Sequence, residues 1–316
     1  MKAFVKYKYG GPEVLSLEEV EKPIVKEGHL LVNVKANSAN PADWHILRGK
    51  PFLARLAFGL FKPKDKIPGA DFSGIVEEVG QGVTKFKVGE RVYGEMLKGG
   101  AFAEYLCAPE DVCGPMLESA TYPEMAAVPI AGLTALQSLI THGKLKEGES
   151  VLINGATGGV GHFAIQIAKA HGAHVTGVCS SKNNDFAKSM GADEVIAYDQ
   201  EDIHQYKGEF DLILDCNGNL NFADFKRMGK RGVLIGFTTM GQMMSVMMKK
   251  AFSKLPITLF TAKANNEDLT TLSNLIKEGK IKPYLGKTYP YSKLPEAIDH
   301  LETKSTRGKV VISWEM

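Results

Sequence analysis

One stretch limits the possible folds of this chain more than any other: a short apolar run, Val151–Ile153, that leads into a glycine-rich turn. The turn carries Gly155, Gly158 and Gly161 and opens a segment, 159–171, with apolar residues at helical spacing. A buried strand, a tight turn and a helix N-terminus in this order form an anion site, because free backbone N–H groups and the helix dipole both favour a phosphate. A turn with only a structural purpose is the alternative.

The residues after the turn favour a dinucleotide site. A second apolar strand, Val175–Cys179, comes at the distance that a βαβ unit requires. Sites for NAD place an acid at the end of this strand to hold the ribose 2′-hydroxyl. This chain has polar residues without an acid there: Ser180, Ser181, Lys182 and Asn183. Hydroxyls, an ammonium and an amide can hold a 2′-phosphate, so the sequence predicts NADPH. An ordinary polar loop would explain the residue types but not the missing acid.

Composition excludes several classes of protein. Lys and Arg total 38 and Asp and Glu total 36, a net charge of +2, whereas a nucleic-acid-binding surface needs a basic excess. No apolar run of about 18 residues occurs and the first residues alternate like a strand, so we expect neither a membrane-spanning helix nor a signal peptide. The four cysteines form no Cys-x-x-Cys pair and are typical of reduced thiols in a cytoplasmic protein.

The pattern of turns and periodicity divides the chain. Residues 1–121 hold strand patterns such as Leu30–Ala36 and Asp71–Gly80, which predict a mainly antiparallel, partly closed β domain. Residues 122–265 alternate helices and strands, which predicts an α/β domain with a doubly wound parallel sheet of the Rossmann type. We expect residues 266–316 to rejoin the first domain. The expected parallel strands are Val151–Ile153, Val175–Cys179, Glu194–Ala197, Phe210–Asp215, Gly232–Gly236 and Ile257–Thr261.

Five further runs follow one another along nearly the whole chain: Tyr9–Leu15, Asn40–Asp43, Pro68–Gly74, Ala131–Ala135 and Arg307–Val311. Together with the glycine turn, they resemble the zinc-free, quinone-oxidoreductase-like branch of the medium-chain dehydrogenases/reductases. The resemblance implies an NAD(P)H enzyme that transfers hydride. It also implies a GroES-like catalytic domain (1–121 and 266–316), a Rossmann dinucleotide-binding domain (122–265), and a homodimer paired through the cofactor domains.

The departures from the family pattern concern metal binding. Zinc-dependent members carry Cys at the position of Asn40, Gly-His-Glu at Gly69–Asp71, and a third ligand, Cys, near Ala131. The four-cysteine lobe of a structural zinc site is also missing, since residues 94–110 hold only Cys107. Zinc needs a tetrahedral set of N, S or O ligands. We therefore expect no metal.

Without a Lewis acid, reducing an activated double bond is easier than oxidising a simple alcohol. Hydride added to an enone or a quinone moves negative charge onto a carbonyl oxygen, which a hydrogen-bond donor must stabilise. The resemblance implies Asn40 as that donor, with Asp43 as a further candidate catalytic residue; a turn-forming Asn before Pro41 is the alternative. His45 stands where zinc members keep a proton-relay His, but the intervening hydroxyl residue is Ala42 here. We therefore favour a structural His45 over a proton donor.

The resemblance also implies contacts to the cofactor at the carboxyl ends of the parallel strands. Thr134 is expected near the nicotinamide or the pyrophosphate, and Phe260 and Ala262 at the nicotinamide ring. Asn217 and Phe237 are expected at the ribose and nicotinamide, with capping of their strands as the alternative. The expected contacts to the pyrophosphate and the 2′-phosphate are Gly155, Ala156, Thr157, Gly158, Gly159, Val160, Ser180, Ser181, Lys182, Asn183 and Tyr198.

These patterns predict an NADPH-dependent, metal-free reductase of small apolar quinones or α,β-unsaturated carbonyls. A metal-free ketone or aldehyde reductase and an NADPH-binding sensor or structural protein with little turnover are the alternatives. One segment fits no motif: Phe52–Phe61 is apolar and is flanked by Lys50, Lys62, Lys64 and Lys66. We interpret it as a mobile lid over an apolar substrate, with a membrane-surface segment and plain packing as alternatives.

Overall fold

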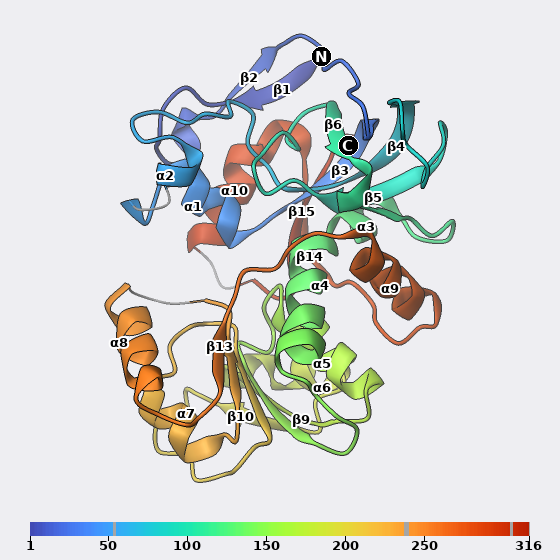
Figure 1. The fold of residues 1–316 in the computed structure, drawn as a ribbon. Helices are drawn as coiled ribbons and strands as arrows, with labels where there is room; N and C mark the ends of the chain where they lie inside the picture. Colours follow the sequence, from blue (N-terminus) through green and yellow to red (C-terminus); the bar gives the residue numbers. More distant parts are fainter. Residues whose placement is uncertain (53–54, 237–239, 304–305, 316) are drawn as a thin grey trace. The chain divides into compact units, whose positions relative to one another are not determined.

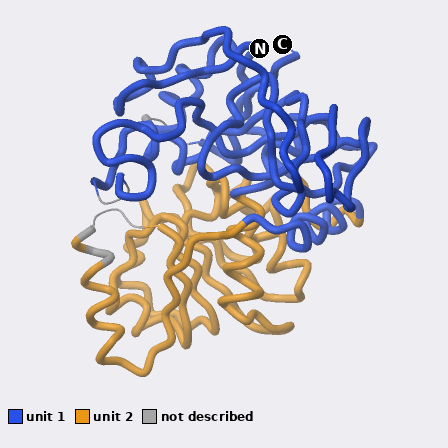
Figure 2. Tube along the Cα trace, turned by 45° about the horizontal axis from the view of Figure 1, so that its top comes forward, with its two compact units in different colours: residues 1–130, 264–277, 283–316 blue, residues 131–263, 278–282 orange. Residues whose placement is uncertain are grey.

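The computed structural model describes residues 1–52, 55–236, 240–303 and 306–315. Its contacts divide the chain into two compact units (Figure 2). Unit 1 comprises Met1–Ile130, Ala264–Lys277 and Pro283–Met316, and unit 2 comprises Ala131–Lys263 and Glu278–Lys282. The first boundary follows Ile130 rather than residue 121, because helix α3 (Tyr122–Ala126) packs on strands of unit 1. Ser73 Oγ, on one of those strands, donates a hydrogen bond to the Tyr122 carbonyl (2.7 Å).

A six-stranded parallel sheet forms the centre of unit 2 (Figure 1). Its strand order is β10-β9-β8-β11-β12-β13, and the order reverses between β8 and β11. This arrangement confirms the predicted doubly wound sheet of the Rossmann type. The strands are β8 (Ser150–Asn154), β9 (His174–Cys179), β10 (Glu194–Ala197), β11 (Leu212–Asp215), β12 (Gly232–Leu234) and β13 (Ile257–Leu259).

Helices cover this sheet with apolar side chains. Helix α5 packs on β8 and β9 and buries Phe163 and Ile167, and a core around Leu152 and Ile213 packs against Phe225 of α7. Helix α4 continues directly into a π-helical segment, Gln137–His142. The helices are α4 (Pro129–Leu136), α5 (Gly161–Ala170), α6 (Asn184–Ser189), α7 (Phe222–Met228) and α8 (Met240–Ala251).

Unit 1 is built on a seven-stranded sheet with the order β14-β15-β3-β4-β5-β7, and β6 pairs with β3. Its described pairings are antiparallel except for β14–β15, in agreement with the predicted mainly antiparallel domain. The late strand β15 pairs with the early strand β3. The strands are β3 (His29–Ala39), β4 (Asp71–Val79), β5 (Arg91–Glu95), β6 (Tyr105–Pro109), β7 (Cys113–Pro115), β14 (Leu285–Pro290) and β15 (Lys309–Ser313).

Smaller elements complete unit 1. A hairpin of β1 (Lys2–Val5) and β2 (Ser16–Glu19) precedes the sheet, and the helices are α1 (Pro41–Arg48), α2 (Arg55–Phe58), α9 (Asn266–Lys277) and α10 (Leu294–Thr303). In the described part of unit 1, 3₁₀ turns occur at Pro12–Val14, Glu110–Val112 and Tyr291–Lys293; a further turn, Ser181–Asn183, belongs to unit 2. Among the described helices, none is both long enough and apolar enough to cross a bilayer.

Candidate active site

The glycine turn leaves room for a ligand at the start of α5. Gly155 has a φ of +83°, in the left-handed region, and a Cβ there would lie 2.6 Å from Asn217 Oδ1. A Cβ on Gly161 would lie 2.1 Å from the Gly155 carbonyl oxygen, so this glycine lets the helix approach the strand end. At Gly158 the nearest atom to such a Cβ is 3.5 Å away. The open position beside the first N–H groups of α5 fits a pyrophosphate.

Several other predicted cofactor residues gather at the same edge of the sheet. Strands β8 to β11 are parallel, so the loops at 155–160 and 180–183 and the residues Tyr198 and Asn217 all follow carboxyl ends. Buried Asn183 donates to Thr157 Oγ1 (3.4 Å), which links the second loop to the glycine turn. The structure brings these residues together; their contact with a cofactor stays a prediction.

Asp199 is a member of this edge that sequence reasoning missed. Its carboxylate accepts hydrogen bonds from Ser181 Oγ (2.7 Å) and Ser181 N (2.8 Å). These bonds hold the pKa of Asp199 below its ordinary value, and the Lys182 charge contributes. The Ser181 hydroxyl is therefore already engaged, and Lys182 is exposed beside Asp199; its contact with a 2′-phosphate stays a prediction. Asp199 follows β10 and Ser181 follows β9. The two residues come together because these strands pair, which a local sequence pattern does not indicate.

Two buried polar residues fix the loop that carries Asn217. Asn154 Nδ2 donates to Asp215 Oδ1 (2.7 Å), and the Asp215 carboxylate accepts from Gly218 N (2.9 Å) and Leu220 N (3.0 Å). Burial raises the pKa of Asp215 to about 6, although these hydrogen bonds oppose the shift. Both residues end apolar strands, and a polar residue in that position is the sequence signal that could have identified them.

The remaining predicted cofactor residues are more dispersed along the chain. Thr134 is half-buried on α4. Phe260 follows β13, and its ring centroid lies 4.2 Å from that of His142. Beyond Ala262, Lys263 exchanges two hydrogen bonds with the Gln137 amide (2.8 and 3.1 Å), which fixes this strand end against the π-helical segment. Phe237 lies outside the described residues.

The predicted catalytic residue Asn40 belongs to a buried polar row in unit 1, made of Lys309, Ser38, Asn40, Asp43, Asp71 and Glu95. Four of these residues lie on neighbouring strands, β15, β3, β4 and β5, where Ser38 faces Asp71 and Asp71 faces Glu95 in register. The other two, Asn40 and Asp43, lie at the N-terminus of α1. Each of the six is at most 5% exposed.

Hydrogen bonds hold the Asn40 amide in one orientation. Its Nδ2 donates to Asp71 Oδ2 (2.9 Å) and to the Ser38 carbonyl (3.4 Å), and its Oδ1 accepts from Lys309 Nζ. Lys309 Nζ also lies 3.4 Å from Asp71 Oδ2. Asp71 further accepts from Ser38 Oγ (2.7 Å) and Ile130 N (3.0 Å). Asn40 is thus more than a turn residue before Pro41, and both hydrogens of its amide are engaged.

Burial sets the protonation states of the acids in the polar row. It raises the pKa of Asp43 to about 7, with the Asp71 charge adding to the shift and the Asn40 N–H bond (2.8 Å) opposing it. It raises the pKa of Glu95 to about 8, again helped by Asp71, and Glu95 Oε2 has no hydrogen-bond partner among the described residues. Burial also lowers the pKa of Lys309, which the neighbouring carboxylates oppose. Lys309 Nζ lies closest among the acids of the row to Asp71 Oδ2, at 3.4 Å, and the raised pKa of Glu95 favours its protonated form at neutral pH.

His45 lies on α1, and its described contacts are with neighbours in sequence rather than with the polar row. Its ring stacks on Trp44 with centroids 3.7 Å apart, and Nδ1 lies 3.1 Å from the Lys50 carbonyl oxygen. Burial lowers the pKa of His45, so the ring is neutral at physiological pH. These contacts fit a structural residue, and a role as proton donor stays untested.

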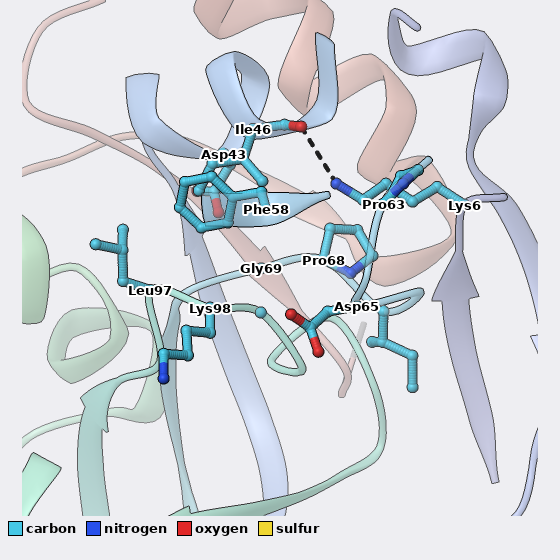
Figure 3. Close-up of a pocket in the computed structure, with 12 residues that line it drawn as sticks. Lys6, Asp43, Ile46, Phe58, Pro63, Asp65, Pro68, Gly69, Leu97 and Lys98 are labelled. Atoms are coloured by element: carbon cyan, nitrogen blue, oxygen red, sulfur yellow. Dashed lines mark hydrogen bonds between the residues drawn. The ribbon is translucent and has the colours of Figure 1, made fainter. Parts of the chain in front are cut away.

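A pocket in unit 1 adjoins Asp43 (Figure 3). Phe58, Pro63 and Leu97 supply apolar walls. Lys6, only 2% exposed, donates from Nζ to the Ile46 carbonyl (3.4 Å). Burial lowers the pKa of Lys6 to about 8, and Asp43 opposes the shift. Asp43 thus stands between this pocket and the Asn40 backbone.

The positions at which zinc-dependent family members hold their ligands carry other side chains here. Asn40 binds Lys309 and Asp71, and Ala70 is buried. In the part of the chain that the structure describes, no group of three or more His, Cys, Asp or Glu residues could hold a metal ion.

Comparisons with known proteins place these features in context. Residues 26–118 match the model of the alcohol dehydrogenase GroES-like domain, and residues 190–312 match that of zinc-binding dehydrogenases. The chain is 34% identical over 319 residues to the chloroplast envelope quinone oxidoreductase homolog of Arabidopsis thaliana, covering 96% of this chain and 95% of the relative. It is 31% identical to the chloroplastic NADPH-dependent alkenal/one oxidoreductase of that plant, covering 99% and 79%. The solved quinone oxidoreductase of Coxiella burnetii superposes with a TM-score of 0.88 at 32% identity, covering 99% of both chains.

Proposed function

We propose that this chain, which belongs to the quinone oxidoreductase-like family of medium-chain dehydrogenases/reductases, transfers hydride from NADPH to a quinone or to the C=C bond of an α,β-unsaturated carbonyl. The observation that carries the proposal is the buried Asn40 amide, fixed by the Lys309–Asp71 ion pair where zinc-dependent members hold a metal ligand. A zinc-independent reaction is part of the proposal. Reduced cysteines fit a cytoplasmic location, and an edge strand such as β13 is available for pairing two cofactor domains.

The residues of the chain have separate tasks in this reaction. When bound, NADPH supplies the hydride. The glycine turn at 155–160 and the first turn of α5 hold the pyrophosphate, and Lys182 neutralises the 2′-phosphate. Asn40 Nδ2 stabilises the negative charge that develops on the substrate oxygen. Its 3.4 Å contact with the Ser38 carbonyl is the longer of its two bonds and is the one that a substrate oxygen replaces.

Replacing Asn40 with alanine is expected to lower kcat about 10²–10³-fold, the usual effect of removing one donor to a developing oxyanion. Steady-state kinetics with a quinone, together with NADPH titration, would measure it. The matched control is Asn37→Ala, a buried amide on β3 that binds the Asp71 and Ala101 carbonyls. Equal losses in kcat for both variants would assign Asn40 a structural role only.

Lys182→Glu is expected to weaken NADPH binding far more than NADH binding, because a carboxylate in this loop joins Asp199 in repelling the 2′-phosphate. Fluorescence titration of both cofactors would measure the two dissociation constants. Lys188→Glu, an exposed lysine of α6, is the control. An equal loss for NADPH and NADH would show that Lys182 does not contact the phosphate.

NADPH oxidation against a quinone, an aliphatic enone, an enal and a saturated ketone tests the proposed reaction directly, with product identification. We expect turnover of the quinone or of the C=C bond. Turnover of the saturated ketone alone, leaving the enone C=C intact, would assign a carbonyl reductase. Tight NADPH binding without turnover of any acceptor would assign a sensor or structural protein.

A further inference from the structure

The segment Lys50–Lys66, called the 50–66 segment below and described except for residues 53 and 54, is held firmly on one side. Tyr9 Oη donates to the Gly59 carbonyl (2.6 Å), and Arg55 Nε donates to the Gly49 carbonyl (3.0 Å) while its guanidinium lies over the Tyr9 ring (4.4 Å). Phe58 and Pro63 turn inward and line the pocket of Figure 3. The inner side of the segment is therefore already packed against other residues of unit 1.

Its outer side presents large apolar groups to solvent. Phe61 is 90% exposed, Leu56 66% and Phe52 63%, and Leu60 beside Phe61 is exposed as well. Single exposed apolar residues are common on protein surfaces, but four within ten positions, opposite a packed inner side, indicate a contact surface. Plain packing therefore does not explain these four side chains.

Lysines outnumber acids around these groups. Lys50, Lys62, Lys64 and Lys66 are all exposed, and Asp65 is the acid within the segment. The whole chain carries a net charge of only +2, so this excess is local. Exposed apolar side chains with exposed lysines on both sides of them in sequence match a surface with anionic headgroups above a hydrocarbon layer.

We propose that the 50–66 segment docks reversibly on a bilayer that contains anionic lipid, with Leu60 and Phe61 entering the acyl boundary and the lysines at the headgroups. A second copy of the chain fits less well. In a two-fold symmetric contact the same patch meets itself, and the four lysines would face four lysines. The inference does not depend on the proposed reaction.

Co-sedimentation of the full chain with vesicles tests the proposal, without NADPH or acceptor. We expect binding to vesicles of phosphatidylcholine mixed with phosphatidylserine, weakened by salt, and little binding to phosphatidylcholine alone. Lys62→Gln and Lys64→Gln should each weaken binding about fivefold. Phe61→Ser should weaken it about tenfold or more. Matched controls are Lys87→Gln and Ile24→Ser; both residues are exposed, Ile24 to 85%.

Three outcomes would overturn the proposal. Absence of binding to either vesicle would exclude a lipid surface. A dimer that Phe61→Ser dissociates in sedimentation velocity, without vesicle binding, would assign the face to a second copy. A raised KM for a soluble quinone in Phe61→Ser, with vesicle binding unchanged, would assign a lid. Because vesicle binding is measured without turnover, its failure leaves the proposed reductase activity untouched.

Discussion

Replacing Lys309 with methionine is expected to lower the free energy of unfolding by about 3–5 kcal/mol. Lys309 is 3% exposed and its Nζ lies 3.4 Å from Asp71 Oδ2, so its removal leaves a fully buried carboxylate without a cation. The Asn40 Oδ1 also loses its donor. Denaturation by guanidinium chloride at neutral pH would measure the loss.

Two further variants identify the cause of that loss. Adding Asp71→Asn to Lys309→Met is expected to restore much of the stability, because the uncompensated charge is then gone. Lys230→Met is the matched control: Lys230 pairs with Asp211 at 2.8 Å but is 63% exposed, and exposed pairs contribute little. Equal, small losses for Lys309→Met and Lys230→Met would show that the polar row holds no essential ion pair.

Glu95→Gln is expected to become more stable relative to the unmodified protein as pH rises, by a total on the order of 5 kcal/mol. Burial raises the pKa of Glu95 to about 8 in the folded protein. The unfolded chain releases this proton near the ordinary glutamate pKa, so between that pH and about 8 the folded state binds more protons. Stability therefore falls with rising pH through this window and levels off above it.

Urea unfolding of both proteins at a series of pH values would measure this effect. The difference between the two unfolding free energies cancels contributions from other groups, including much of that from Asp43. Glu78→Gln, an exposed glutamate of β4, is the control and should give a difference that does not change with pH. If the difference in unfolding free energy between Glu95→Gln and the unmodified protein did not change with pH, the Glu95 carboxyl would have its ordinary pKa in the folded protein.

The strands of the parallel sheet could be predicted because each is a short apolar run between turns, and a local pattern suffices to find such runs. Other elements, among them β14 and α1 of unit 1, could not. Strand β14 exposes Gly286 and Lys287 and lacks regular alternation, and α1 buries only Asp43 and Leu47 in eight residues. Strand β14 is stabilised by its pairing with β15, which the local sequence does not indicate.

The residues of the candidate site also differ in whether a local sequence pattern predicts them. The glycine turn and the 180–183 loop are each a single continuous stretch of sequence, and their residue types alone predict a dinucleotide site. Asp199 reaches Ser181 over 18 positions and Lys309 reaches Asp71 over 238, so neither partnership is visible in a local pattern. A lysine leading an apolar strand, as Lys309 does before Val310–Ile312, was the available signal.

The distance between Asp71 and Lys309 along the chain has a consequence for biosynthesis. At about 5–20 residues per second, a ribosome adds Lys309 roughly 10–50 s after Asp71. During that interval β3 has no β15 to pair with, and Asp71 has no Lys309 beside it. All of unit 2, by contrast, precedes Lys309 in the chain. The whole of unit 2 is therefore synthesised before the strand that closes the sheet of unit 1, and the Asp71–Lys309 contact cannot form until then.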